Sequence, residues 1–152
     1  MKKFKQLLAY ITSRNLVADE QLSCFVTDCE ITLSGKKVQD GAIIAAYIHY
    51  QAVYEIERFG GDANRVLTHF SSWLYNNDQS DTEEELDKAS FDIEPVDDHL
   101  VDIMATVDFS ESIELQEQDG GEFQFGAKFY SLVPNEFSVA ESFEIVGDIT
   151  HG

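Results

Sequence analysis

The sequence predicts an α+β fold: a mostly antiparallel sheet with two main helices packed on one of its faces. Two stretches, 4–15 and 63–75, carry apolar residues at helical spacing. Several others alternate apolar and polar residues with a period of two, which is typical of half-buried strands. Short turns rich in Gly and Asp separate the alternating stretches, and this favours hairpins and antiparallel pairing.

The composition predicts a single domain over residues 1–152. A chain of 152 residues and 17.2 kDa is long enough for one core and short for two. It is 43% hydrophobic and includes eleven Phe, six Tyr and one Trp, so it can bury a proper core. No internal repeat or Pro/Gly-rich linker divides it.

The N-terminal third is expected to hold one helix and a short hairpin. An apolar helical stripe runs through 4–15 and consists of Phe4, Leu7, Leu8 and Ile11. Residues 21–26 and 30–33 are β-prone and flank a turn signal at Asp28. A second, polar turn is expected at 34–37.

The middle of the chain gives the clearest strand and the clearest helix. Residues 42–59 are expected to form a strand, because from Ile48 onward they alternate. Gly60 and Gly61 end it, and Asp62 is a suitable N-cap for the helix predicted over 63–75. That helix presents one apolar face: Val66, Leu67, Phe70, Trp73 and Leu74.

The second half predicts a loop and further strands. Residues 79–88 are polar and acidic and are expected to form a mobile loop. Strands are expected at 91–94, at 100–109 with 112–116 continuing or bending it, and at 122–130. Residues 97–99 and 118–121 are turns between them. The tail after Pro134 is weakly strand-like.

The charge of the chain is strongly negative and unevenly placed. The formal net charge is −19, and residues 1–75 contribute nothing to it, because they hold eight acids and eight bases. Such a balance argues against direct nucleic-acid binding and against an anionic membrane surface. With no apolar run long enough to span a bilayer and no signal-peptide pattern, the expected address is the cytosol of the producing cell.

Catalytic and metal-binding patterns are not found. The four histidines are scattered, Cys24 and Cys29 match no zinc spacing, and the acids of 79–88 lack the spacing of a calcium loop. Gly60-Gly61-Asp62 lacks the glycine spacing of a dinucleotide site and the lysine of a phosphate loop. We therefore expect no enzyme activity, no cofactor and no metal.

The order of the elements resembles a known family. The carrying segments are a Leu22–Ile31 hairpin, Tyr54–Asp62 leading into Ala63–Leu74, and Leu100–Val107 running into Ile113–Leu115. They resemble the tail completion protein R family of contractile-tailed, peduovirus-type bacteriophages. The likeness covers about residues 4–115, so we take 1–115 as the family-like core. The acidic loop 79–88 and the C-terminal strands or extension 116–152 depart from it.

The resemblance implies a tail-terminator-like fold without an active site. The positions carried over are fold-defining ones: Gly60, Gly61, Asp62, Trp73, Leu74, Asn76 and Asn77. Two further groups are expected from this chain alone. An apolar set in the C-terminal stretch is a candidate interface: Phe137, Val139, Phe143 and Ile145. An acidic set is a candidate charged surface: Asp81, Glu83, Glu84, Glu85 and Asp87.

The function implied is that of a phage or prophage structural protein that caps the tail tube as a ring, with a hexamer favoured, and presents a head-joining surface. Its partners would be itself, tail tube or sheath proteins and a head-completion or connector protein. It would lie at the head-proximal end of the virion tail, after assembly in the bacterial host cytoplasm. An alternative is an acidic inhibitor or DNA mimic that binds a basic nucleic-acid-binding partner. A small-molecule binding domain or enzyme stands third.

Overall fold

The computed structural model describes residues 1–77 and 89–133, and it confirms the predicted α+β class. Six strands form one sheet in the order β1-β2-β4-β6-β5, and β3 pairs with β4 on the edge that β6 also uses. Every pairing is antiparallel. The elements are α1 (Lys2–Ser13), η1 (Asp19–Gln21), β1 (Leu22–Gln39), β2 (Ala42–Phe59), α2 (Ala63–Asn77), β3 (Ala89–Pro95), β4 (Val101–Glu117), β5 (Phe123–Phe125) and β6 (Lys128–Leu132).

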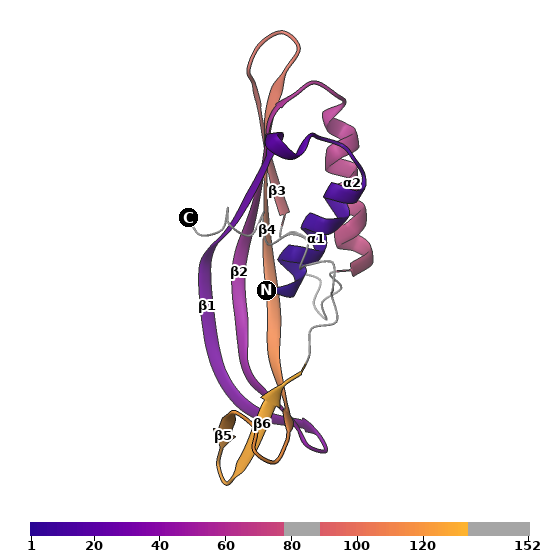
Figure 1. The fold of residues 1–152 in the computed structure, drawn as a ribbon. Coiled ribbons are helices and arrows are strands. Elements are labelled where there is room, and N and C mark those ends of the chain that lie inside the picture. Colours follow the sequence, from indigo (N-terminus) through magenta and orange to yellow (C-terminus); the bar gives the residue numbers. More distant parts are fainter. Residues whose placement is uncertain (78–88, 134–152) are drawn as a thin grey trace.

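Both helices lie on the same face of the sheet, as predicted (Figure 1). The predicted stripe of α1 is buried, and so are three residues of the predicted α2 face, Val66, Phe70 and Trp73. They pack against the helix-side residues of β2 and β4, including Tyr54, Ile103 and Phe109. Periodicity therefore identified the main core correctly, because each element buries one face only.

The centre of the sheet is the pair β2 and β4. β2 has the predicted bounds, and β4 runs unbroken from the predicted strand through its expected continuation. An extra residue at Arg58 on β2 shifts the register between Ile56 and Phe59, and Arg58 has φ 53°. Its N–H donates to Asp102 Oδ1 at 2.9 Å, so a side chain of the partner strand stabilises the bulge.

The predicted hairpin at 21–33 and the polar turn at 34–37 are wrong. β1 is one strand through both, and Asp28 (φ 52°) belongs to a β-bulge where one extra residue interrupts the pairing with β2. The true turn lies at Asp40 and Gly41, with φ +74° at Gly41. The Asp-Gly pair is a strong hairpin signal. The residues around Asp28 have the composition of a turn. β1 nevertheless continues through them, because it pairs with β2 on both sides of the bulge.

The strand predicted over 122–130 is also wrong. The segment breaks at Gly126 (φ 67°) into β5 and β6, which pair with each other. The turn at 118–121 is present, with the Gly121 N–H donating to the Gln118 carbonyl at 2.9 Å. This turn connects β4 to β5, but the two strands are not neighbours in the sheet, because β6 lies between them.

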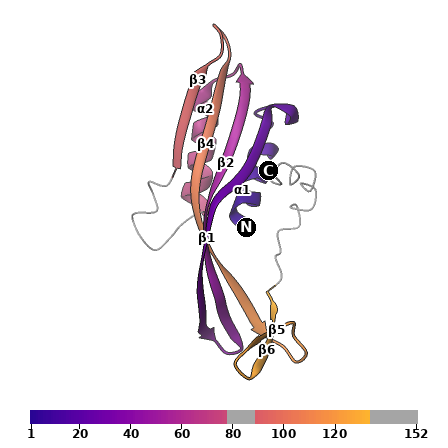
Figure 2. The same cartoon turned by 90° about the vertical axis from the view of Figure 1, so that its left-hand side faces the viewer.

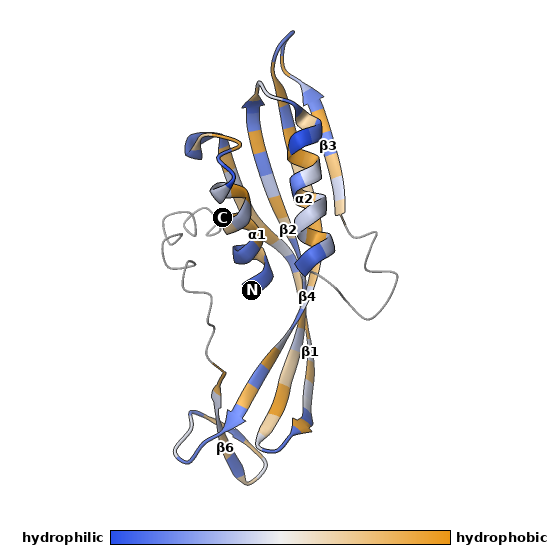
Figure 3. Cartoon of the chain, turned by 90° about the vertical axis from the view of Figure 1, so that its right-hand side faces the viewer, coloured by the Kyte–Doolittle hydropathy of each residue, from blue (hydrophilic) through white to orange (hydrophobic). Residues whose placement is uncertain are grey.

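The sheet extends well beyond the helical layer (Figures 1 and 2). We call this part the β arm: residues 30–39 of β1, 42–47 of β2, 113–117 of β4, and all of β5 and β6. A small second core stabilises it, made of Ile43, Leu115 and Tyr130. The arm therefore has its own packing, and no helix of the described chain lies over it (Figure 3).

Candidate assembly surfaces

Two tyrosines of β2 hold α1 against the sheet. The Tyr54 hydroxyl donates to the Phe4 carbonyl at 2.9 Å, and the Phe4 N–H donates to the Tyr50 hydroxyl at 3.1 Å. Both rings are fully buried. Burial, together with the nearby Tyr50, Cys24 and Glu111, raises the pKa of Tyr54 well above its ordinary value of 10.0. The hydroxyl thus remains a neutral donor at any ordinary pH.

Glu111 of β4 completes the anchor of α1. Its carboxylate accepts hydrogen bonds from the backbone N–H groups of Lys2 and Lys3, each at 2.8 Å, and from the Tyr50 hydroxyl. The first amides of a helix lack acceptors within the helix, and the carboxylate of Glu111 provides these acceptors from the sheet. Burial acts to raise the pKa of Glu111, but the hydrogen bonds from Tyr50, Lys3 and Lys2 and the N-terminal ammonium outweigh it. The pKa therefore lies below its ordinary 4.5.

The family-like positions at the start of α2 stabilise the turn that enters this helix. Asp62 Oδ1 accepts a hydrogen bond from the Asn64 N–H at 2.9 Å, which is a helix cap. A Cβ on Gly61 would lie 2.8 Å from the ring of Phe59, so the glycine allows that ring to fold over the backbone. At Gly60 the nearest side chain, Leu100, would lie 3.3 Å from a Cβ.

The family-like positions at the end of α2 divide between core and surface. Trp73 is buried and meets Phe109 edge to face at 6.2 Å, and Leu74 packs partly buried beside the core. Asn77 Nδ2 donates to the Trp73 carbonyl at 3.0 Å, while Asn76 is exposed. The contacts of Trp73, Leu74 and Asn77 stabilise the fold, and nothing in the structure explains a fold-defining role for Asn76.

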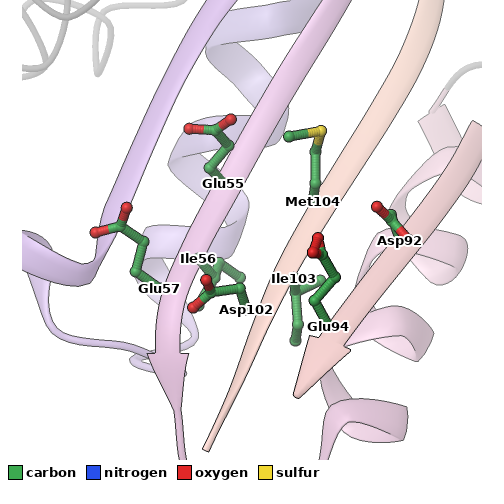
Figure 4. A pocket seen from close by; sticks show the side chains of 8 residues that line it. All are labelled: Glu55, Ile56, Glu57, Asp92, Glu94, Asp102, Ile103 and Met104. Atoms are coloured by element: carbon green, nitrogen blue, oxygen red, sulfur yellow. The ribbon is translucent and has the colours of Figure 1, made fainter. Parts of the chain in front are cut away.

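The face of the sheet opposite the helices carries acids. Figure 4 shows five carboxylates gathered around Met104 and a shallow pocket of about 150 Å³. We call this set the acidic face: Glu55, Glu57, Asp92, Glu94 and Asp102. Within residues 1–77 and 89–133, no group of three His, Cys, Asp or Glu side chains is placed to hold a metal ion. The negative potential of this face disfavours phosphate and favours a basic partner.

The β arm exposes large apolar side chains. Leu33 is 85% exposed, Ile31 60% and Leu132 55%. Further exposed members are Val38, Tyr47, Phe125 and Phe129. Apolar residues gathered on one projecting part of a protein are typical of a contact surface. The alternation of Ile31 and Leu33 with polar neighbours signalled a strand with an apolar face, but it did not show that the face lies beyond the helices.

Two sets of predicted site residues lie outside the described residues. They are the acidic set at 81–87 and the apolar set Phe137, Val139, Phe143 and Ile145. The surfaces that the structure does describe, the acidic face and the β arm, come from β1 to β6. Sequence reasoning did not single out either of them.

The structure is an α+β domain whose helices are anchored to the sheet, with an acidic sheet face and an exposed apolar arm, and such surfaces are typical of proteins that associate with others. The particular family follows from sequence comparison. The chain belongs to the P2 phage tail completion protein R (GpR) family, whose sequence profile matches residues 1–128. This is a family of phage tail components rather than of enzymes, and it confirms the resemblance found above.

A phage relative agrees with this assignment. The chain is 22% identical over 130 residues to an uncharacterized 19.2 kDa protein from the rep-hol intergenic region of Haemophilus phage HP1 (strain HP1c1). The alignment covers 84% of this chain and 78% of the relative. No solved structure matches the chain significantly. Among the described residues, neither helix is long and apolar enough to cross a membrane.

Proposed function

We propose that the protein completes a phage tail by capping the tail tube as a ring of identical subunits, a hexamer being favoured, and that the ring presents a head-joining surface. The observation that carries the proposal is the family match over residues 1–128. The ring would sit at the head-proximal end of a contractile tail and assemble in the host cytoplasm. Its partners are other copies, tail tube or sheath proteins and a head-completion or connector protein.

The β arm supports self-association. The arm extends beyond the helical layer (Figure 1), and it exposes apolar side chains there, led by Leu33 and Ile31, which are available to a neighbouring copy. A contact between the arm of one copy and a different surface of the next is heterologous, and heterologous contacts close into rings when the rotation permits. Phe137, Val139, Phe143 and Ile145 are proposed as further contacts to a neighbour.

The first test is the solution mass of the full chain by light scattering, with negative-stain imaging of the same sample. Six copies of a 17.2 kDa chain form a ring of about 100 kDa. Leu33→Asp should reduce the mass to one subunit without changing the melting temperature, because the side chain is 85% exposed. Thr32→Asp, an exposed substitution on the other face of the same strand, is the matched control and should leave the ring intact.

The second test is completion itself. Purified protein is added to tails made in cells that lack it, and joining to heads is counted by imaging and by infectious titre. The wild type and Thr32→Asp should restore joining, whereas Leu33→Asp should not. Failure of the wild-type protein both to form a ring and to restore joining would refute the proposal.

The acidic face favours a second candidate, binding to a basic nucleic-acid-binding protein as a DNA mimic would. Its five carboxylates line one shallow pocket on one face of the sheet. Replacing Glu94 and Asp102 by Gln and Asn would weaken such a partner in a pull-down from phage-producing cells. Unchanged tail completion by the same variant would separate this activity from the first.

A further inference from the structure

One stretch of the β arm is basic and apolar in a strongly acidic chain. Residues 31–39 of β1 hold two lysines and no acid, whereas the whole chain has a formal net charge of −19. Lys36 and Lys37 are both exposed, and so are the large apolar side chains of Ile31 and Leu33. We call residues 31–39 the basic arm segment. A positive charge beside exposed apolar side chains is typical of a surface that binds an acidic partner.

The strand register places Leu33 and Lys37 of this segment on one face of the sheet. Each of them pairs with a residue of β2, and the β4 partners of those two residues are Ile113 and Leu115. Paired residues share a face, and so do residues two apart on a strand. Phe109, in the same alternating series of β4, packs in the core beneath the helices. Leu33 and Lys37 therefore lie on the helix side of the sheet, in the part that extends beyond the helices.

The acidic face lies on the other face of the sheet. Met104, which is 39% exposed, lies among its carboxylates (Figure 4) and pairs with Glu55 of β2 and Asp92 of β3. Asp102, two residues before Met104 on β4, belongs to the same face. Ile103, between these two residues, is buried in the core on the helix side. Because neighbouring side chains of a strand alternate, the acidic face points away from the helices.

One copy cannot bring its basic arm segment onto its own acidic face. Leu33 lies opposite Ala46 of β2, and Glu55 of the acidic face follows further along the same strand, after about 30 Å of extended chain. The two surfaces also lie on opposite faces of one sheet. A contact between them must therefore join two copies, and it is heterologous because the two copies use different surfaces.

We propose that the basic arm segment of one copy docks on the acidic face of the next copy. Lys37 would meet the carboxylates, and Leu33 would pack against Met104, whose flexible thioether adapts to a partner. Lys36 alternates with Lys37 but lies within a Debye length of about 10 Å, so its charge adds to the attraction. The inference rests on the proposed ring and names the two surfaces that join its subunits.

Charge complementarity is the reason to choose a second copy as the occupant. Asp40 lines the same small pocket at the arm tip as Lys37, and Glu117 there pairs with Lys128 at 3.4 Å. With Asp40 counted, residues 31–41 still carry a net charge of +1, whereas the acidic face contributes five carboxylates. Two acidic faces repel each other, so the charges favour the contact between arm and face over the contact between two faces.

Charge reversal in the full chain tests the contact. Lys36→Glu with Lys37→Glu should reduce the mass found by light scattering from that of the ring to one subunit of 17.2 kDa. Asp92→Lys with Glu94→Lys, on the acidic face, should have the same effect. All four side chains are exposed, so the melting temperature should stay unchanged in both variants.

The matched control reverses two exposed acids outside the acidic face. Glu20→Lys with Glu122→Lys changes the net charge by the same amount as the acidic-face variant and should leave the ring intact. Loss of the ring in this control as well would show that the total charge, and not the acidic face, governs assembly, and would overturn the inference.

Combining the two reversals shows whether the surfaces meet each other. A chain with all four substitutions at Lys36, Lys37, Asp92 and Glu94 has an acidic arm and a basic face, and it should form the ring again. A ring formed by either two-residue variant alone, or a four-residue variant that stays a single subunit, would overturn the inference. If the wild type forms the ring and completes tails in that case, the proposed function stands and only this contact is wrong.

Carbodiimide cross-linking of the wild-type chain locates the contact without substitutions, because it joins an amine to a carboxyl group only where the two touch. In a mixture of unlabelled and isotope-labelled chains, peptide mass spectrometry should find mixed-isotope links between Lys36 or Lys37 and the acidic face. Absence of these links would overturn the inference. Links in phage-producing cells from the acidic face to a basic protein, instead of to a second copy, would also overturn it and make that protein the occupant.

Discussion

The carboxylate of Glu111 accepts a hydrogen bond from the backbone N–H of Lys3 at 2.8 Å, and this contact joins residues 108 positions apart. The sheet thereby caps the helix that begins the chain. Because Tyr50 donates to the same carboxylate and also accepts from Phe4, one hydrogen-bonded group connects β2, β4 and α1. The relationship explains how a carboxyl group can lie partly buried beside the apolar core.

Replacing Glu111 by Gln should lower the free energy of unfolding by about 2 kcal/mol, the usual scale for hydrogen bonds to a charged group. The amide would keep one acceptor but turn its NH₂ group toward donors. Urea denaturation followed by circular dichroism measures the loss. Glu122→Gln, on an exposed side chain, is the control and should change stability by less than about 0.5 kcal/mol. Equal stabilities of the two variants would show that the anchor contributes nothing.

The stability contribution of Glu111 should depend on pH in acid. Its folded-state pKa lies below the ordinary 4.5, so the contribution is complete above that value and is lost as the pH falls through the folded-state pKa. The difference in unfolding free energy between wild type and Glu111→Gln should therefore shrink below pH 4.5. Denaturation curves at a series of acid pH values measure it. If the difference in unfolding free energy instead grew in acid, folding would raise the pKa of Glu111 rather than lower it.

Tyr54→Phe should destabilise the protein by about 1 to 2 kcal/mol, because it removes a buried hydrogen bond to the Phe4 carbonyl while leaving the ring in place. Tyr47→Phe is the matched control, since Tyr47 lies on the same strand and is 41% exposed. Thermal unfolding compares the two variants. A larger loss of stability for Tyr47→Phe than for Tyr54→Phe would mean that the hydrogen bond of Tyr54 does not anchor α1.

The two cysteines should differ sharply in reactivity. Cys24 is fully buried, and burial raises its pKa to about 12, whereas Cys29 is exposed at the bulge of β1. Since the thiolate is the reactive form, the native protein should incorporate one equivalent of iodoacetamide at neutral pH and two after denaturation. Mass spectrometry counts the labels. Rapid native labelling of Cys24 would mean that the sheet opens beneath α1.

Local periodicity was enough for the elements that bury one face. The strand 42–59 and the helix beginning at 63 were predicted at their observed starts, because alternation and helical spacing record burial residue by residue. The cap at Asp62 followed equally from local chemistry, since a cap contacts residues only two or three positions away.

Register and strand breaks could not be predicted in this way. At Asp28 a bulge and a turn have the same local composition, and only pairing with β2 on both sides decides between them. At Gly126 an unbroken alternation of Phe123, Phe125 and Phe129 concealed a turn between two strands. The acidic face likewise gathers residues from β2, β3 and β4 that are far apart in the chain.

The sequence by itself determined the fold class, the helical stripes, the central strands and, through family resemblance, the membership in a phage tail completion family. Only the tertiary structure decided which carboxyl caps α1 and which apolar strand residues are exposed on the β arm. The physical reason is that burial patterns are local, whereas what covers a face or pairs with an edge depends on residues distant in the chain.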